Sequence, residues 1–346
     1  MDAAQEAYVD EKTSMVNSEF EIRPSILVGD TADVYSQRTL TILRNEGINP
    51  MVTIEFFAQK EGVFCGVKEA RALLTKVLPE SGSEVWALEE GESVGKKEVA
   101  LRIKAPYGSF GLYETTISGI LSSSSGWAAA ARECVQAADG VPVIGLAARH
   151  VHPNVAANID YSSVIGGCVS VSTILGARLS GITPAGNMPH ALPLLLGDTV
   201  RAMESFDRHM PQEVPRVAVV DTFKDEAEEA LTVANALRER LRGILLDTPI
   251  ERGGVTADLV QEVRERLDLS GFRHVEIFVS GGFTPERIRE FVASGAPVNG
   301  FGIGSYISDA SPNDFTADIH EIDGKPIAKR GRTPGVTASP RLDRVM

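Results

Sequence analysis

The stretch SGGFTPERIREF, which begins at residue 280, has the composition of an anion-binding turn. Gly281 and Gly282 let the backbone approach a ligand closely, because glycine has no Cβ. Thr284 and Pro285 are a typical N-cap and first residue of a helix. The unpaired N–H groups and the positive dipole end at a helix start attract anions. This stretch therefore predicts a phosphate site at a helix N-terminus.

A second glycine pair follows the next apolar run, in the sequence NGFGIGS. Gly302 and Gly304 would form another backbone edge without side chains. For either pair alone, a tight turn at a strand end is the simpler explanation. Two pairs after neighbouring strands, the first of which opens a capped helix, favour phosphate binding. The predicted phosphate cradle comprises Ser280, Gly281, Gly282, Gly302 and Gly304.

Carboxylates and a histidine follow other apolar runs. Asp221 in VVDTF and Asp247 in LLDT end strand-like segments, where a carboxylate is costly unless it has partners. A cap on the following helix is the alternative role for Asp221. His190, in AGNMPHALPLLLG, would alone be explained by packing near a helix start. Together with Asn187 and the two aspartates, it becomes a candidate catalytic residue.

The segment AARHVHP contains Arg149, His150 and His152. An arginine at this kind of position suits a carboxylate or phosphate, because its guanidinium binds such groups with two hydrogen bonds. A solvated loop is the alternative, and a His-x-His pair without a third ligand is weak evidence for a metal. Metal ligands therefore stay unassigned. Tyr35, in TADVYSQRT, is by its pattern more typical of a core or interface aromatic than of a ligand platform.

The elements that must position these residues are short buried strands alternating with helices. The predicted strands are 141–146, 181–186, 216–222, 243–248, 274–282 and 299–305. The clearest helix is 225–241, which has acids in its first turn and arginines in its last. A βα barrel or a doubly wound sheet would explain this alternation. The candidate residues lie at strand carboxyl ends, where barrels build their active sites, so we expect the barrel.

The region before residue 112 has a different pattern, with strand-like runs and the short amphipathic helix VKEARALLTKV. It predicts a separate α+β domain. The tail from Asp314 contains HEIDGKPIAKRGR, which is typical of a hairpin, and we expect the tail to return to that domain. The predicted domains are 1–112 joined by 313–346, and 113–312 for the barrel.

Composition limits the partners. The chain has 346 residues, of which 43% are hydrophobic, and a formal net charge of -13, which disfavours binding to nucleic acid or an anionic membrane. The three cysteines form no CxxC pair, which indicates neither a zinc site nor a disulfide framework. The acidic start, MDAAQEAYVDEKTSM, is not typical of a secretory signal. No run approaches the ~20 apolar residues of a membrane span. We therefore expect a soluble cytoplasmic protein.

Taken together, the motifs resemble the nicotinate phosphoribosyltransferase family, particularly its shorter archaeal and bacterial members. The resemblance runs from about Val28 to Arg332 and depends on the order of many short pieces. These are GDTADVYSQRTLTILRNEG, YETTISGIL, ARHVHP, IGGCVSVST, AGNMPHA, VVDTFKDE, GILLDTPIERGG, FVSGG, GFGIGSYI and DGKPIAKRGR. The resemblance implies an α/β fold with an incomplete βα (TIM-like) barrel, like that of quinolinate phosphoribosyltransferase. It also implies an α+β domain built from both chain ends and a homodimer with shared active sites.

Such enzymes join nicotinate to phosphoribosyl pyrophosphate and release nicotinate mononucleotide and pyrophosphate in NAD biosynthesis. Many use ATP as co-substrate through a phosphorylated histidine, and Mg²⁺ accompanies the pyrophosphate. By resemblance His190 is the phosphorylated histidine, and Arg149 and His152 bind substrate. Asp221 and Asp247 lie near the ribose and the reacting centre. The glycine loops hold the phosphoribosyl phosphate, and Tyr35 stacks on the pyridine ring, from the neighbouring subunit.

The sequence departs from the family pattern at two positions. Leu245 stands where an arginine is usual before the second aspartate, and Asn187 stands where a threonine is frequent. These departures put the coupling to ATP in more doubt than the transfer. Two alternatives stay open: quinolinate phosphoribosyltransferase, which decarboxylates its substrate, and a non-catalytic relative that binds a nucleotide or phosphosugar. The expected ligands are otherwise small molecules only.

Overall fold

The computed structural model describes residues 19–346, so the acidic stretch at the start of the chain lies outside the described residues. The chain forms two compact units. One comprises the chain up to Ala129 together with Ala310–Met346, and the other is Ala130–Asp309. By sequence the boundary is predicted at residue 112. In the structure it falls inside helix α6 (Glu114–Ala137), which continues through the serine run at 122–125.

The first unit is built on an antiparallel sheet with the order β13-β12-β1-β5-β3-β14. Its strands are β1 (Met51–Ala58), β3 (Glu84–Ala87), β5 (Val99–Pro106), β12 (Phe315–Ile322), β13 (Lys325–Pro326) and β14 (Asp343–Arg344). A small second sheet pairs β2 (Gly62–Val63) with β4 (Ser93–Val94). The helices that precede α6 are α2 (Pro24–Leu27), α3 (Val34–Asn45), α4 (Val67–Val77) and α5 (Tyr107–Phe110), and η1 (Gly111–Tyr113) joins α5 to α6.

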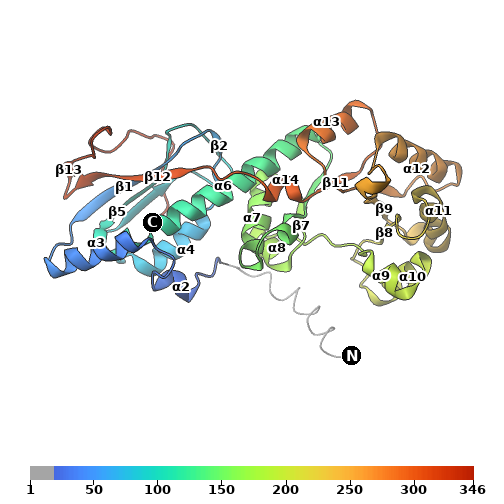
Figure 1. Ribbon diagram of the computed structural model, residues 1–346, viewed down its shortest axis with the longest axis horizontal. Helices are drawn as coiled ribbons and strands as arrows, with labels where there is room; N and C mark the ends of the chain where they lie inside the picture. Colours follow the sequence, from blue (N-terminus) through green and yellow to red (C-terminus); the bar gives the residue numbers. More distant parts are fainter. Residues whose placement is uncertain (1–18) are drawn as a thin grey trace. The chain divides into compact units, whose positions relative to one another are not determined.

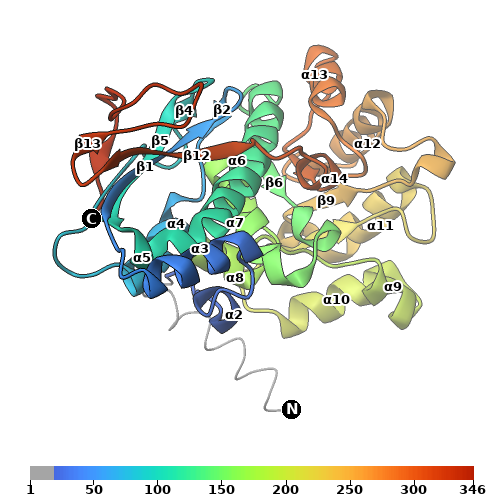
Figure 2. The same cartoon turned by 60° about the vertical axis from the view of Figure 1, so that its left-hand side comes forward.

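Both ends of the chain contribute to this sheet. Strand β12, drawn in red, runs antiparallel to β1, drawn in blue, along nearly its whole length (Figures 1 and 2). The hairpin predicted from HEIDGKPIAKRGR is present, because β12 pairs with β13, and Asp323 between them has a positive φ of 50°. The α+β domain formed from both chain ends is therefore confirmed.

The second unit contains a parallel sheet with the order β7-β6-β11-β10-β9-β8. Its strands are β6 (Val143–Gly145), β7 (Ser170–Val171), β8 (Val217–Val219), β9 (Gly243–Leu246), β10 (Glu276–Val279) and β11 (Gly300–Ile303). Strands β7 and β8 form the two edges and are not paired with each other, so the sheet is an incomplete barrel (Figure 1). This confirms the predicted α/β fold class.

Helices follow the parallel strands along the chain, and all but the last of them lie between two such strands. They are α7 (Ala156–Gly166), α8 (Ile174–Ser180), α9 (Ala191–Leu196), α10 (Thr199–His209), α11 (Glu226–Leu237), α12 (Ala257–Leu269), α13 (Pro285–Ala293) and α14 (Ser305–Ser308). Short 3-10 turns are η2 (Ala147–His150), η3 (Pro153–Val155), η4 (Arg238–Arg240) and η5 (Ile250–Arg252). Among the described residues, no helix is long and apolar enough to span a membrane.

The prediction of a strand at 181–186 is wrong. The strand of this region is β7, and the segment after α8 is a loop that begins with Gly181 in a left-handed conformation. Only one backbone bond joins the loop to that strand, from the Ala185 N–H to the Val171 carbonyl at 2.8 Å. Pro184 within the segment has no N–H to donate, which prevents a continuous ladder.

The helix that follows β10 is anchored by aromatic packing. The ring of Phe283 lies 5.0 Å from that of Phe291 and 5.4 Å from that of Phe301, all between centroids. These three rings are buried and join the turn before α13, the last turn of that helix and strand β11. Edge-to-face aromatic packing of this kind holds the turn at 280–283 firmly against the sheet.

Candidate active site

The predicted site residues of the second unit lie along one edge of the parallel sheet. Asp221 follows β8, Asp247 follows β9, Ser280 follows β10 and Gly302 lies in β11. Because these four strands are neighbours in the sheet and run in the same direction, their carboxyl ends meet at this edge. Arg149 follows β6, the strand next to β11. This is the edge where barrels bind their ligands.

The two glycine stretches are adjacent. The hydroxyl of Ser280 donates to Asp247 Oδ1 at 2.6 Å. A Cβ added at Gly281 would lie 3.3 Å from the same oxygen, and one added at Gly302 would lie 3.1 Å from the Cβ of Ser280. There is therefore no room for larger residues between these strand ends, and the backbone itself lines the edge.

Several backbone N–H groups at this edge have no partner within residues 19–346. In the turn after β10 these belong to Gly281, Gly282 and Phe283. At the start of α14 they belong to Gly304 and Ser305. Gly281 and Gly282 have φ angles of +97° and +66°, which residues with a Cβ rarely adopt. Unpaired N–H groups arranged in this way can donate hydrogen bonds to one shared anion.

His190 and Asp221 form a hydrogen-bonded pair, with 2.8 Å between imidazole Nε2 and carboxylate Oδ1. The aspartate side chain is only 4% exposed, whereas that of the histidine is 39% exposed. Burial raises the pKa of Asp221, the His190 partner lowers it, and the nearby charge of Asp247 raises it again. With an ionised Asp221, Nε2 carries the proton and the other ring nitrogen, Nδ1, keeps its lone pair.

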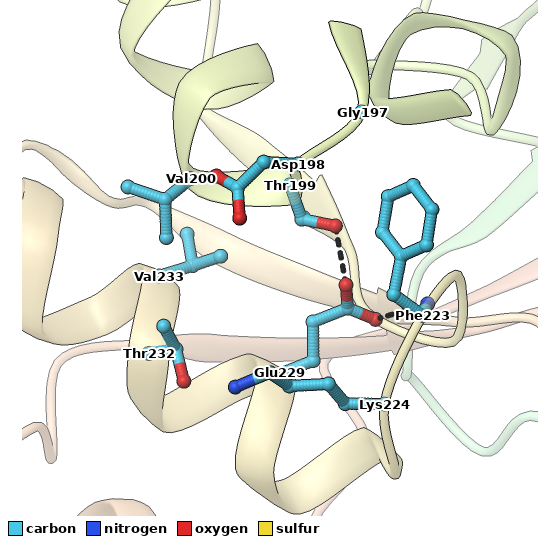
Figure 3. A pocket seen from close by; sticks show the side chains of 9 residues that line it. All are labelled: Gly197, Asp198, Thr199, Val200, Phe223, Lys224, Glu229, Thr232 and Val233. Carbon is cyan, nitrogen blue, oxygen red and sulfur yellow. Dashed lines mark hydrogen bonds between the residues drawn. The ribbon is translucent and has the colours of Figure 1, made fainter. Parts of the chain in front are cut away.

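A buried glutamate fixes the loop that carries Asp221. Glu229 of α11 accepts hydrogen bonds from the backbone N–H groups of Thr222, at 2.9 Å, and Phe223, at 3.4 Å. Its other oxygen accepts from the hydroxyl of Thr199, the first residue of α10 (Figure 3). A hollow of about 220 Å³ opens beside this carboxylate, and Lys224 and Thr232 are among its lining residues. Glu229 thus joins the loop after β8 to the start of α10.

A second acidic residue of α11 contacts the loop after β9. Glu226, which is buried, accepts from the hydroxyl of Thr248 at 2.8 Å. Thr248 directly follows Asp247, as Thr222 directly follows Asp221. Residues three apart in a helix lie on the same face, so one face of α11 supports both aspartate loops. The helix dipole accounts for acids in a first turn, but it does not predict the inward contacts of Glu226 and Glu229.

The other predicted residues have less defined surroundings. Arg149 and His152 are exposed, and His152 Nδ1 accepts from the Asn154 N–H at 3.1 Å. Asn187 is half-buried and forms no hydrogen bond within the described part of the chain. The imidazole of His150, which was not predicted as a site residue, lies against Gly304, since a Cβ there would be 2.8 Å from its Nε2.

Tyr35 belongs to the first unit, where it lies in the first turn of α3 and is 59% exposed. Its pKa is raised by partial burial and by the neighbouring Asp33. Within residues 19–346 no group of three or more histidine, cysteine or acidic side chains is arranged to hold a metal ion. The metal ligands that we left unassigned stay unassigned.

Comparisons with known proteins cover nearly the whole described chain. Residues 33–125 match the family model of the quinolinate phosphoribosyl transferase N-terminal domain, and residues 127–318 match that of the C-terminal domain. The chain is also 31% identical over 247 residues to a nicotinate phosphoribosyltransferase of Mycobacterium tuberculosis. That match covers 70% of this chain and 52% of the relative, so the chain spans about half the length of such curated relatives.

Among solved structures, a nicotinate-nucleotide pyrophosphorylase from Pyrococcus furiosus matches with a TM-score of 0.82 and 41% identity, over 92% of this chain and 82% of that one. The human nicotinic acid phosphoribosyltransferase matches with a TM-score of 0.71 and 19% identity, over 88% of this chain and 77% of the human chain. The second likeness concerns the fold alone. Because these two domain models together match residues 33–125 and 127–318, the chain belongs to the quinolinate phosphoribosyl transferase family.

Proposed function

We propose that this chain is a nicotinate phosphoribosyltransferase, which transfers the phosphoribosyl group of phosphoribosyl pyrophosphate to nicotinate. The observation that carries the proposal is the edge where unpaired backbone N–H groups of two glycine turns lie beside Asp247. Such an edge suits a sugar phosphate, because the N–H groups bind the phosphate and the carboxylates face the sugar. The 31% identity to a protein of that name supports the choice of nicotinate.

In the proposed reaction the bond between ribose C1 and pyrophosphate breaks and a bond between C1 and the pyridine nitrogen forms. The sugar carries positive charge in the transition state, so carboxylates fixed nearby stabilise it. Asp247 is held by Ser280 and Asp221 by His190, and both therefore keep their positions without reorganisation. The turns at Gly281, Gly282, Gly302 and Gly304 hold the 5′-phosphate.

Nicotinate needs no base, because its ring nitrogen carries a lone pair already. Its carboxylate is the group that Arg149 and His152 would bind, and both of these side chains are exposed at the end of β6. Tyr35 of a neighbouring subunit would stack on the pyridine ring in a homodimer. Positioning of this kind supplies much of the rate acceleration in a reaction between two bound substrates.

Magnesium is the ion expected with pyrophosphate, and hard oxygen ligands suit it. The residues fit an ion held mainly by substrate and water, because two carboxylates, Asp221 and Asp247, lie at neighbouring strand ends whereas no cage of three ligands occurs in the described chain. When bound, the ion would neutralise charge on the leaving pyrophosphate. The residues of the chain would orient the sugar and the base.

ATP as a co-substrate would act through His190. Its Nδ1 atom has a lone pair and no partner among the described residues, and it can attack the γ-phosphorus of ATP. A nitrogen–phosphorus bond then forms, the bond between the γ-phosphorus and the β,γ-bridging oxygen breaks, and ADP leaves. Asp221 would stabilise the positive charge that develops on the imidazole. Hydrolysis of the phosphohistidine would then bias the transfer towards product.

The direct test is to incubate the purified protein with nicotinate, phosphoribosyl pyrophosphate and Mg²⁺, with and without ATP. Chromatography should detect nicotinate mononucleotide, formed in an amount equal to the pyrophosphate released, and more of it with ATP. Absence of the mononucleotide under both conditions overturns the proposal. Nicotinamide in place of nicotinate is the matched control, because it lacks the carboxylate that Arg149 would bind.

Quinolinate phosphoribosyltransferase is the second candidate, favoured by the family models and by the name of the Pyrococcus furiosus relative. Quinolinate carries two carboxylates, and its transfer is accompanied by loss of CO₂. Arg149 is the cation predicted to bind such a group at the strand-end edge, and His150 and His152 lie near it in the chain. Replacing nicotinate with quinolinate in the same assay, with detection of CO₂, distinguishes the two candidates.

A further inference from the structure

Arg287 is not among the residues that the sequence motifs identify, yet it contacts the glycine turn after β10. Its Nη1 atom donates to the carbonyl oxygen of Gly281 at 2.7 Å and to that of Gly282 at 3.4 Å. Its Nη2 atom donates to the carbonyl oxygen of Val255, in the loop that follows η5, at 2.5 Å. One guanidinium thus joins the turn after β10 to the loop that precedes α12.

These bonds determine where the N–H groups of the turn point. In a trans peptide the C=O and N–H groups lie on opposite sides of the chain. The carbonyls of Gly281 and Gly282 face Arg287, so the N–H groups of Gly282 and Phe283, which share those peptide units, face away from it. These are the N–H groups that have no partner within residues 19–346. Arg287 therefore fixes these two peptide units so that their N–H groups point to where an anion could bind.

The position of Arg287 is itself unusual for a cation. It lies in the first turn of α13, where the helix dipole disfavours positive charge. The guanidinium carbon is stacked over the ring of Phe283 at 4.4 Å, and Arg287 forms no ion pair with the described acidic residues. Burial lowers its pKa. Carbonyl oxygens and aromatic faces thus take the place of a carboxylate partner for this guanidinium.

We propose that Arg287 is a positioning residue, which holds the Gly281–Gly282 turn with its N–H groups directed at the phosphate of a sugar phosphate. Arg287 does not itself contact the ligand. It acts through the carbonyl groups that it binds. The inference rests on the proposed phosphate cradle, and it adds the residue that keeps the cradle open when no ligand is bound.

The test uses the full chain and ribose 5-phosphate as the probe, with binding measured by calorimetry. Arg287→Met removes the donors, and Arg287→Lys keeps the charge but cannot reach three carbonyls with a planar fork. Both variants should weaken ribose 5-phosphate binding at least about tenfold, as loss of charge-assisted hydrogen bonds does. Arg289→Met is the control, because Arg289 lies on the same helix and, within residues 19–346, forms an ion pair only with the exposed Glu286, at 3.5 Å. This control should bind as the parent chain does.

Thermal unfolding of each variant separates positioning from folding. A lowered melting temperature with unchanged ribose 5-phosphate affinity in Arg287→Met or Arg287→Lys would overturn the inference, because it would show a purely structural role. If Arg287→Lys alone bound ribose 5-phosphate as tightly as the parent chain, the inference would also be overturned. The positive charge, and not the hydrogen bonds to the three carbonyl groups, would then determine the affinity. Failure of the parent chain to bind ribose 5-phosphate would do so as well. If the probe binds in an Arg287-dependent way but no nicotinate mononucleotide forms, the inference stands and the proposed function fails.

Discussion

The hydrogen bond between His190 and Asp221 gives the two nitrogens of the imidazole different surroundings. Nε2 is bonded to a buried carboxylate, Nδ1 has no hydrogen-bond partner within residues 19–346, and the histidine side chain is 39% exposed. In this arrangement the histidine can act as a nucleophile without any change in its anchoring. A structural capping role would not need the second nitrogen to stay accessible.

Replacing His190 by alanine should therefore abolish stimulation by ATP and leave slow phosphoribosyl transfer. Loss of the proposed nucleophile would remove the coupled reaction, whereas the cradle and Asp247 would stay in place. The measurement is the rate of nicotinate mononucleotide formation with and without ATP. His209→Ala, at the exposed C-terminal end of α10, is the control. The same ATP dependence in His190→Ala and the parent chain would remove the assigned role.

The buried charge of Asp221 gives a prediction about stability and pH. Because burial raises its pKa in the folded state, the folded chain holds this proton more tightly than the unfolded chain. The resulting stability is present below the ordinary carboxyl pKa and is lost as the pH rises through the raised pKa. Asp221→Asn lacks that loss, so its free energy of unfolding should rise relative to that of the parent chain as the pH increases above the ordinary carboxyl pKa of about 4.

Urea unfolding at several pH values measures this difference. Asp258→Asn, at an exposed position in the first turn of α12, controls for effects of the substitution itself. The variant Asp221→Asn should at the same time lose most transferase activity. A difference in unfolding free energy that stays constant over the pH range would contradict the role given to burial.

Gly281 tests the cradle directly. Alanine at its φ of +97° should cost about 1–3 kcal/mol of stability, and its Cβ would lie 3.3 Å from the carboxylate of Asp247. Gly271, with a φ of +87° and open space around it, is the matched control. We expect both alanine variants to unfold at lower urea concentrations, but only Gly281→Ala to lose affinity for phosphoribosyl pyrophosphate. Equal affinities in the two variants would argue against a ligand at this turn.

At the scale of elements, the sequence predicted the strand ends well and their connections poorly. Buried parallel strands are continuous apolar runs in the sequence. The positions of Asp221, Asp247 and Ser280 at strand ends could therefore be predicted from where these runs stop. That His190 reaches Asp221 could not, because it depends on the path of a loop that was predicted as a strand. The inward contacts of Glu226 and Glu229 were missed because acids in a first turn are usually explained by the dipole.

Arg287 was missed for a related reason. It stands in a helical pattern between Glu286 and Glu290, which is typical of a solvated helix face. The available signal was that a cation in the first turn of a helix is unfavourable and needs a partner. The sequence does not reveal which carbonyl groups take that place, because those of Gly281 and Gly282 depend on the shape of the turn and that of Val255 lies 32 residues away in the chain.

Helix α11 offers a test at this scale. Glu229→Gln places an amide where a carboxylate accepts from two backbone N–H groups and a hydroxyl, so it should destabilise the chain by about 1–3 kcal/mol. It should also lower the transfer rate, because the loop that carries Asp221 loses its anchor. Glu228→Gln is the control, since Glu228 is exposed and pairs only with Lys224, at 2.6 Å. Equal urea midpoints for the two variants would refute the anchoring role.

At the scale of the whole molecule, the first unit depends on both ends of the chain. Strand β12 is an inner strand of its sheet and pairs with β1 through seven aligned residue pairs, from Val52 with Ile322 to Ala58 with Phe315. The ring of Phe315 lies 6.0 Å from that of Phe64 in the core of this unit. The last strand, β14, pairs only two residues with β3 at the opposite edge.

Truncation should therefore have unequal effects at two positions. Removing residues 313–346 would expose the edge of β1, whose residues are mostly buried, and such an edge promotes aggregation. We expect this variant to be largely insoluble or to elute as aggregates in size-exclusion chromatography. Removing only residues 343–346 leaves β12 in place and should give a chain that elutes as the parent does, with a lower melting temperature. If the chain that ends at residue 312 eluted and melted as the parent does, the N-terminal strands would fold without the tail. The β1–β12 ladder would then make no measurable contribution to the stability of the first unit.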